Sequence, residues 1–351
     1  MNCRKTRRTS AKTPFFVCLH DIEIDQFISA DINRTGIWEQ HINGKLANCF
    51  VDTFHEQNGV RPVDRDPSIA VYNFTVPFVE QRAHQIACRP ANLRPSFMIC
   101  VHPTTSDVFV SGSIAKQGNW EAGLSQLIAG YCRAFPQSTF VDLGANLGMH
   151  ALFAAALGRP VVAVEPSVEN WPHLHKAVLM NNFTDRFTLL PYAVSDQRTT
   201  VTMSKNDRNL GHTYIMQNNK AESKFKFEIR TILLNDLAPF IKTKDVILKI
   251  DVEQHECYVI RGGKQFFETF NVPYVLMEWG FIRGVAEQCK QDMLRIFDEL
   301  GYVAQKMNGA AIDLARETPM DIIWVKKPRT VTTKLPVHQP ATTTSTPKSP
   351  S

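Results

Sequence analysis

The sequence has 351 residues, of which 44% are hydrophobic and 21% are charged. This length and balance are typical of a globular protein with one large domain and appendages, or with two small domains. The formal net charge is +5, but ten positive charges lie in residues 1–12 and 326–351, which contain no acid, so the rest of the chain carries −5. Because the excess of positive charge lies in the two tails, we expect no nucleic-acid partner.

No apolar run approaches the roughly 18 residues that a membrane span needs, and Pro14–Leu19 is too short for the apolar part of a signal peptide. We therefore expect a soluble intracellular protein. None of the eight cysteines forms a Cys-x-x-Cys pair, so we expect no metal site. Their even number permits disulfides, and Asn-x-Ser/Thr triplets begin at Asn33, Asn73 and Asn182. These features leave the secretory-pathway lumen as an alternative location.

The chain divides into four regions by composition. Residues 1–12 are basic and residues 328–351 are rich in Thr, Pro and Ser, and we predict that both tails are disordered. Residues 13–105 show short apolar runs without a pattern that assigns a fold. Residues 106–327 form the main folded domain in this interpretation. It opens with a predicted strand at Asp107–Ser111 and a helix over 120–135, whose apolar residues recur at helical spacing.

From Thr139 onward, short apolar strands alternate with amphipathic helices. We predict strands at 140–143, 161–164, 187–194, 246–250, 274–277, 302–305 and 322–325, and helices at 148–157, 167–182, from 254 and at 287–300. Residues 195–235 interrupt the order with a β excursion that includes 199–203 and 225–231. This alternation predicts an α/β fold, with a mostly parallel sheet covered by helices on both faces.

The first strand of this series ends in the loop Asp142–Gly148, and the second ends at Glu165. In an open α/β sheet, ligands bind at the carboxyl ends of the strands. Gly144 allows a sharp turn and a close backbone approach, and Gly148 stands where the next helix begins. Glu165 follows Gly144 by 21 residues, the offset at which a carboxylate reaches a ribose diol.

The loop does not fit a dinucleotide. A pyrophosphate loop has the pattern Gly-x-Gly-x-x-Gly, and its second glycine is replaced here by Asn146, which would crowd the phosphates. A cofactor without phosphates, such as S-adenosylmethionine, does not need that room. Asp142 would then lie near the amino acid end of the cofactor, where it can pair with the ammonium group. A dehydrogenase is accordingly the third choice of function.

The residues from about 107 to 325 resemble the FkbM family of methyltransferases. The similar blocks are Val141–Gly148, Ala163–Pro166, Leu179–Asn182, Ala193, Leu248–Glu253 with Glu256, and upstream Asp107 and Gly118–Glu121. Gln254 departs from the pattern, since the family usually has glycine there. The resemblance implies a Rossmann-like methyltransferase fold with an N-terminal extension, and O-methylation with S-adenosylmethionine as cofactor.

Carrying over the family pattern assigns two groups of residues. Those implied around the cofactor are Asp142, Gly144, Asn146, Gly148, Glu165 and Ala193. Asp251 and Glu253 are implied at the end of the fourth strand, facing the transferred methyl. A hydroxyl acceptor benefits from a nearby base, for which Asp251 is the first candidate and His255 the second. Asp251 and Glu253 are alternatively helix caps, and His255 a surface residue.

Further candidates lie on the acceptor side. Glu278 could orient an acceptor hydroxyl, Trp279 could floor a sugar site or simply pack, and His212 could line the pocket or lie in solvent. The acceptor is expected to be a glycan or small metabolite. The alternatives are N- or carboxyl methylation, and a non-catalytic binding protein that retains the fold. Neither the acceptor nor the oligomeric state follows from the sequence.

Overall fold

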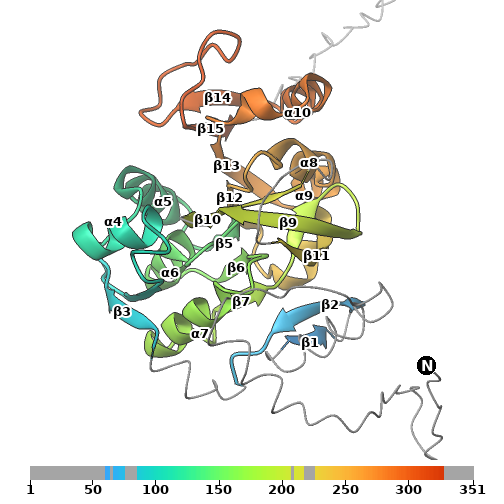
Figure 1. The fold of residues 1–351 in the computed structure, drawn as a ribbon. Coiled ribbons are helices and arrows are strands. Elements are labelled where there is room, and N and C mark those ends of the chain that lie inside the picture. The colour runs from blue at the N-terminus through green and yellow to red at the C-terminus, as the bar shows by residue number, and fades with distance from the viewer. Residues whose placement is uncertain (1–59, 64–65, 76–84, 207–208, 217–225, 328–351) are drawn as a thin grey trace, which may run out of the picture. The chain divides into compact units, whose positions relative to one another are not determined.

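A computed structural model describes residues 60–63, 66–75, 85–206, 209–216 and 226–327. Its centre is a seven-stranded sheet with the order β14-β15-β13-β12-β5-β6-β7 (Figure 1). The strands are β5 (Thr139–Leu143), β6 (Val161–Val164), β7 (Phe187–Leu190), β12 (Asp245–Ile250), β13 (Asn271–Glu278), β14 (Tyr302–Lys306) and β15 (Asp321–Lys326). All neighbouring pairs are parallel except those of β15, which runs antiparallel to β13 and β14. The predicted mostly parallel sheet is confirmed.

The strand order reverses between β5 and β12. From β5 the chain winds outward through β6 to β7, then crosses back to β12 and winds the other way through β13. This reversal leaves a crevice at the carboxyl ends of β5 and β12, the usual ligand position in such sheets. Every residue of β5 and β6 is buried, as expected for strands covered on both faces.

The helices lie on both sides of the sheet (Figure 1). They are α4 (Val110–Gln117), α5 (Ala122–Ala134), α6 (Met149–Ala156), α7 (Trp171–Met180), α8 (Glu256–Arg261), α9 (Lys264–Thr269) and α10 (Glu287–Glu299), with short 3-10 turns η1 (Leu234–Phe240) and η2 (Ile282–Gly284). The helix predicted from Gln254 is divided at Gly262 and Gly263 into α8 and α9. Both glycines pack against backbone or Leu234 so closely that an added Cβ would collide.

Two strand predictions are wrong in detail. The strand predicted at Asp107–Ser111 is instead the start of α4, because the Asp107 carboxylate accepts hydrogen bonds from the Ser111 amide (2.8 Å) and hydroxyl (2.6 Å). These bonds satisfy a donor of the first helical turn. The strand predicted over 187–194 ends at Leu190, since Pro191 offers no amide for a ladder. The chain resumes as β8 (Ala193–Ser195) in another sheet.

The predicted β excursion is confirmed as a four-stranded sheet of order β10-β9-β11-β8. Its other strands are β9 (Thr200–Asn206), β10 (Asn209–Ile215) and β11 (Lys226–Leu233). β9 is antiparallel to both neighbours, and β11 is parallel to β8. Because β8 leaves directly from the end of β7, this sheet begins at the carboxyl edge of the central sheet and stands beside the crevice.

Two hairpins precede the alternating series, one of β1 (Val60–Val63) and β2 (Asp66–Tyr72), the other of β3 (Ala87–Pro90) and β4 (Met98–Val101). The Tyr192 hydroxyl accepts a hydrogen bond from the Ala70 amide of β2 (2.8 Å). The Asn181 side chain both accepts from the Met98 amide (2.8 Å) and donates to the Met98 carbonyl (2.7 Å). The region without an assigned fold therefore supplies elements that pack on the alternating α/β region. Both predicted disordered tails lie outside the described residues.

Among the residues that the structure describes, four cysteines form two disulfides. Cys88 pairs with Cys100 across the β3–β4 hairpin, and Cys257 of α8 pairs with Cys289 of α10. Cys132 is buried as a free thiol. Over the ranges that the structure describes, no helix is both long and apolar enough to cross a bilayer.

Candidate active site

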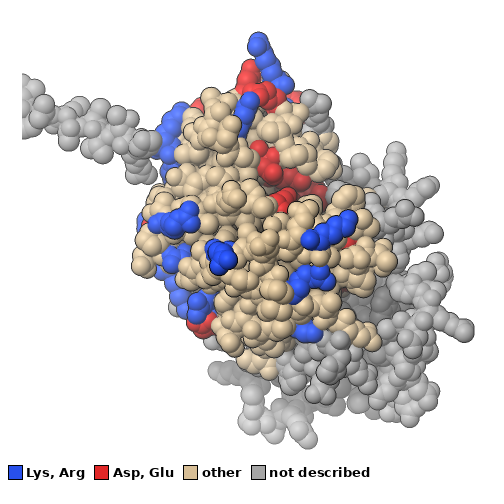
Figure 2. Space-filling model, turned by 90° about the vertical axis from the view of Figure 1, so that its left-hand side faces the viewer, with Lys and Arg blue, Asp and Glu red and all other residues tan. Residues whose placement is uncertain are grey.

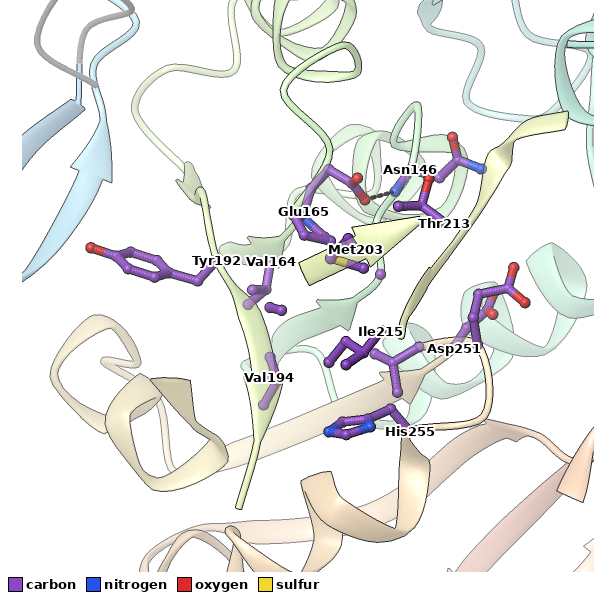
Figure 3. Close-up of a pocket in the computed structure, with 15 residues that line it drawn as sticks. Asn146, Val164, Glu165, Tyr192, Val194, Met203, Thr213, Ile215, Asp251 and His255 are labelled. Carbon is purple, nitrogen blue, oxygen red and sulfur yellow. Dashed lines mark hydrogen bonds between the residues drawn. The ribbon is translucent and has the colours of Figure 1, made fainter. Parts of the chain in front are cut away.

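A pocket opens at the carboxyl ends of β5, β6 and β12 (Figure 3). Its walls come from the first loop, the ends of β6 and β7, the excursion sheet and the loop after β12. The lining residues are Gly144, Asn146, Val164, Glu165, Pro166, Tyr192, Ala193, Val194, Met203, Thr213, Ile215, Asp251, Val252, Glu253 and His255. Seven of the nine predicted site residues are among them. The other two, Asp142 and Gly148, are not among the lining residues.

Glu165 is the buried carboxylate of the pocket. One oxygen accepts a hydrogen bond from the Asn146 amide (2.6 Å), and the other accepts from the Ser167 amide (2.8 Å) and the Asn170 side chain (3.1 Å). A carboxylate offers about four acceptor positions, so it retains capacity for a ligand hydroxyl. Burial raises the pKa of Glu165 to about 7. A ligand that donates hydrogen bonds would favour the ionised form.

Four amides of the loop after β5 already donate hydrogen bonds within the protein. Those of Gly144 and Ala145 donate to the Val164 carbonyl (3.0 and 3.1 Å), and that of Asn146 donates to Glu165. The Gly148 amide donates to the Ala145 carbonyl (2.8 Å). A phosphate-binding loop needs such amides directed at the ligand. The loop therefore matches a cofactor that is held by a carboxylate on its ribose, not by amides on a phosphate.

Residues 142–304 match the family model described as the methyltransferase FkbM domain. The predicted resemblance to this family is confirmed over these residues. The chain thus contains an S-adenosylmethionine-dependent methyltransferase, as the resemblance predicts. No curated protein matches the chain.

Solved methyltransferase structures show weak similarity to the chain. The O-methyltransferase from Bacillus cereus, in complex with SAH, is 11% identical with a TM-score of 0.33, over 59% of this chain and 83% of its own. The TehB-like SAM-dependent methyltransferase from Corynebacterium glutamicum is 11% identical with a TM-score of 0.33, over 62% and 94%. The precorrin-6y C5,15-methyltransferase from Geobacter metallireducens is 8% identical with a TM-score of 0.32, over 62% and 90%. Similarity at this level carries no information about the acceptor.

The pocket of the FkbM domain fits S-adenosylmethionine in its donor set. Glu165 is the residue that would accept hydrogen bonds from the ribose hydroxyls. Apolar side chains line the same pocket and offer a surface for the adenine ring; they are Val164, Pro166, Ala193, Val194, Met203 and Ile215. In Figure 3, Asn146, Glu165 and Thr213 lie at one end of the pocket, and Asp251, Ile215 and His255 at the other. The second end is where an acceptor would meet the cofactor.

A close approach of the backbone explains why position 144 is a glycine. It has φ +77°, and a Cβ there would lie 1.8 Å from the Asp251 carbonyl oxygen. The Asp251 amide also donates to the Leu143 carbonyl (3.1 Å). Close approach at this glycine therefore holds the loop after β12 against the loop after β5. This contact positions Asp251 at the second end of the pocket.

Lys249 lies between two carboxylates and is the main residue whose role the sequence interpretation missed. Its Nζ is 3.2 Å from Asp142 Oδ1 and 3.1 Å from Asp251 Oδ2. Lys249 faces Asp142 directly in the ladder of β12 and β5, and Asp251 follows two residues later on the same face. The neighbouring carboxylates raise the pKa of Lys249 despite its burial, so it stays charged. In this structure the almost fully buried Asp142 therefore forms its ion pair with Lys249.

Further carboxylates extend from Asp251 along the sheet edge. The β12–β13 register places Asp251 beside Glu278, and Glu278 is paired with Asp321 of β15. Burial, then the neighbouring carboxylates, raise the pKa of Glu278 well above its usual range and that of Asp321 to about 6. Figure 2 shows acidic side chains gathered in a hollow on one face of the molecule. We call Asp251, Glu278 and Asp321 the acidic row.

His255 is buried and lines the pocket, so its interpretation as a surface residue is wrong. Its Nε2 lies 2.9 Å from the Ser195 hydroxyl, and its ring stacks on Tyr258 at 4.3 Å. Burial lowers the pKa of His255 to about 4. The imidazole is therefore neutral near pH 7 and can hold a hydrogen bond, but it is a weak base.

The loop after β12 has an unusual backbone. Glu253 and Gln254 both have positive φ, 55° and 71°. Glycine is the residue that adopts this region without cost, so Gln254 occupies a glycine-like conformation. Its side chain reaches Gly284, where an added Cβ would lie 2.4 Å from the Gln254 amide oxygen. The departure from the family pattern therefore leaves the start of α8 at Glu256 intact.

The excursion sheet supplies one wall of the pocket, which the sequence interpretation did not assign. Met203 of β9, and Thr213 and Ile215 of β10, line the pocket, with Thr213 beside Asn146 (Figure 3). The hydrophobic residues of β9 and β10 gave no spacing that would mark them as ligand contacts. The His212 side chain lies outside the described residues. Trp279 is fully buried beside Trp324 (ring centroids 6.2 Å apart), so it packs in the core and floors no sugar site.

Proposed function

We propose that the protein methylates a hydroxyl group of a glycan or small metabolite. The observation that carries the proposal is the Asp251 carboxylate, which lines the pocket and is fixed by a charged lysine. A partly exposed carboxylate at this point can accept the proton that the hydroxyl loses on methylation. Glu253 also lines the pocket and is the second candidate contact for the acceptor.

The bound cofactor supplies an electrophilic methyl group on a sulfonium sulfur, so the protein mainly aligns the partners and excludes water. Lys249 fixes the position of the Asp251 carboxylate through their ion pair. The apolar wall of Met203 and Ile215 reduces access of water to the same space. His255, neutral and bonded to Ser195, can donate or accept one hydrogen bond to the acceptor.

The acidic row favours an acceptor with several hydroxyl groups. Carboxylates and carboxylic acids form hydrogen bonds with hydroxyl donors, whereas phosphate or carboxylate groups would face like charge. This supports a neutral, hydroxyl-rich acceptor over an acid, and ranks carboxyl methylation below O-methylation of an alcohol.

The test is incubation of the purified protein with methyl-labelled S-adenosylmethionine and libraries of neutral, acidic and amine-containing glycans and metabolites. Mass spectrometry should place the label on a neutral polyol as a base-stable ether. A label released by mild base would be a carboxyl ester, and a label on nitrogen would be an amine product; either result would overturn the hydroxyl assignment. The Asp251→Asn variant in parallel separates enzymatic from spontaneous transfer.

A further inference from the structure

Asn182 begins one of the Asn-x-Thr triplets and is exposed in the turn after α7. Its φ of 56° suits asparagine, and its amide donates to the Leu179 carbonyl (3.1 Å). Thr184, the third residue of the triplet, is also exposed. Both side chains that define the triplet therefore face solvent at a surface turn.

Asn73 provides an internal contrast. Its Oδ1 accepts hydrogen bonds from the Thr75 amide (3.0 Å) and hydroxyl (2.8 Å), and its Nδ2 is buried. Phe74, the middle residue, is buried against His175 and Phe187. A bulky group on the Asn73 nitrogen would have to displace this packing, whereas a group on Asn182 would not.

The two ends of α7 lie at opposite edges of the sheet. Near its start, the Trp171 indole donates to the Glu165 carbonyl (2.8 Å) at the pocket. The helix then returns along the sheet, and Asn182 lies shortly before β7 begins at Phe187. Since β7 is parallel to β5 and β6, Asn182 is at their amino ends. A large modification there leaves the pocket open.

The disulfides supply an independent indication of the compartment. Cys100, Cys257 and Cys289 are buried in their bonds, one bond within the hairpin before the FkbM domain and one inside the domain. Disulfides persist in oxidising compartments and are rare in the cytosol. The enzymes that add oligosaccharides to asparagine work in such a compartment.

We propose that the protein resides in the secretory pathway and carries an N-linked oligosaccharide on Asn182, whereas Asn73 stays unmodified. The donor class is a polyprenyl-diphosphate-linked oligosaccharide. The Asn182 Nδ2 forms a bond to the anomeric carbon of the sugar and loses one proton. The bond between that carbon and the diphosphate oxygen breaks, and the diphosphate leaves with the electron pair.

The experiment uses the full chain, purified from eukaryotic cells and treated with peptide N-glycosidase in water labelled with heavy oxygen. This treatment converts a glycosylated asparagine into labelled aspartate, which peptide mass spectrometry locates. The expected result is label at position 182 and none at position 73. Thr184→Ala should abolish the label at 182, Thr184→Ser should keep it, and Asn73→Gln should leave it unchanged.

Alkylation before and after reduction, on the same sample, reports whether Cys257 and Cys289 are joined. An unlabelled Asn182 in a chain that carries this disulfide would overturn the glycosylation site. Free, alkylated Cys257 and Cys289 would overturn the compartment assignment. Label at Asn73 would overturn the burial argument. Cofactor binding does not enter these readouts, so their outcome is independent of the proposed reaction.

Discussion

The Lys249 ammonium lies 3.1 Å from the Asp251 carboxylate, at the point where β12 enters the pocket. The same ammonium is 3.2 Å from Asp142, so one buried cation pairs with a carboxylate of β5 and with the carboxylate directly after β12. Because Asp142 is buried and Asp251 partly exposed, the arrangement connects the core of the sheet to the acceptor side of the pocket.

Lys249→Met should destabilise the protein strongly. Removing one partner of a buried ion pair typically costs about 3–5 kcal/mol, because the other charge stays buried and unpaired. The double variant Lys249→Met/Asp142→Asn removes that charge and should recover a large part of the loss. Urea denaturation measures both. Equal stability of the single and double variants would show that Asp142 is not the partner that matters.

Asp251→Asn should leave S-adenosylmethionine affinity within a few-fold of the parent and lower turnover. Loss of a general base typically costs about a hundredfold to ten-thousandfold. Calorimetry gives the affinity, and methyl transfer to the identified acceptor gives the turnover. His255→Gln is the matched comparison. If Asp251→Asn turns over within about threefold of the parent while His255→Gln does not, the base is His255.

Glu165→Ala should weaken S-adenosylmethionine binding by about tenfold to a hundredfold, the equivalent of charge-assisted hydrogen bonds of about 1.5–3 kcal/mol. It also leaves the Asn146 and Ser167 amides without an acceptor, so a moderate loss of stability should accompany it. Glu268→Ala, at an exposed position of α9, is the control. Since burial raises the pKa of Glu165 to about 7, parental affinity should fall as pH drops below 7. A pH-independent affinity would speak against the ribose role.

Gln254→Gly should raise the free energy of unfolding by about 1 kcal/mol, because glycine adopts positive φ without the side-chain cost. Gln254→Val should lower it, since a β-branched residue fits that region poorly. Thermal unfolding compares the two. A destabilised Gln254→Gly variant would mean that the contact with Gly284 outweighs the backbone cost.

Glu256 and Glu278 should make the protein less stable at high pH. Burial raises the pKa of Glu256 from 4.5 to about 8 and that of Glu278 higher still. Between the unfolded and folded pKa values the folded state holds more protons, so these groups contribute stability at low pH that is lost as pH rises. Glu278→Gln should therefore raise the melting temperature near pH 9 and change it little near pH 4, roughly the unfolded pKa. Glu268→Gln should show no such difference.

The sequence by itself determined the alternating α/β order. It also determined that Glu165, Asn146, Ala193 and Asp251 lie at the pocket. These follow from local rules: strand and helix periodicity, and the meeting of strand ends at one edge of a parallel sheet. The requirement for glycine at a given position is only partly a local property. The positive φ of Gly144 is a turn property, but its contact with Asp251 joins residues more than a hundred positions apart.

Only the tertiary structure decided the partners of Lys249, the burial of His255 beside Ser195, the pairing of Cys257 with Cys289 and the wall formed by Met203 and Ile215. Each depends on contacts between residues far apart in the chain, which no local spacing encodes. The same reason explains the helix at Val110–Gln117: the Asp107 carboxylate caps it from outside the apolar pattern, and that bond outweighs the strand propensity of the segment.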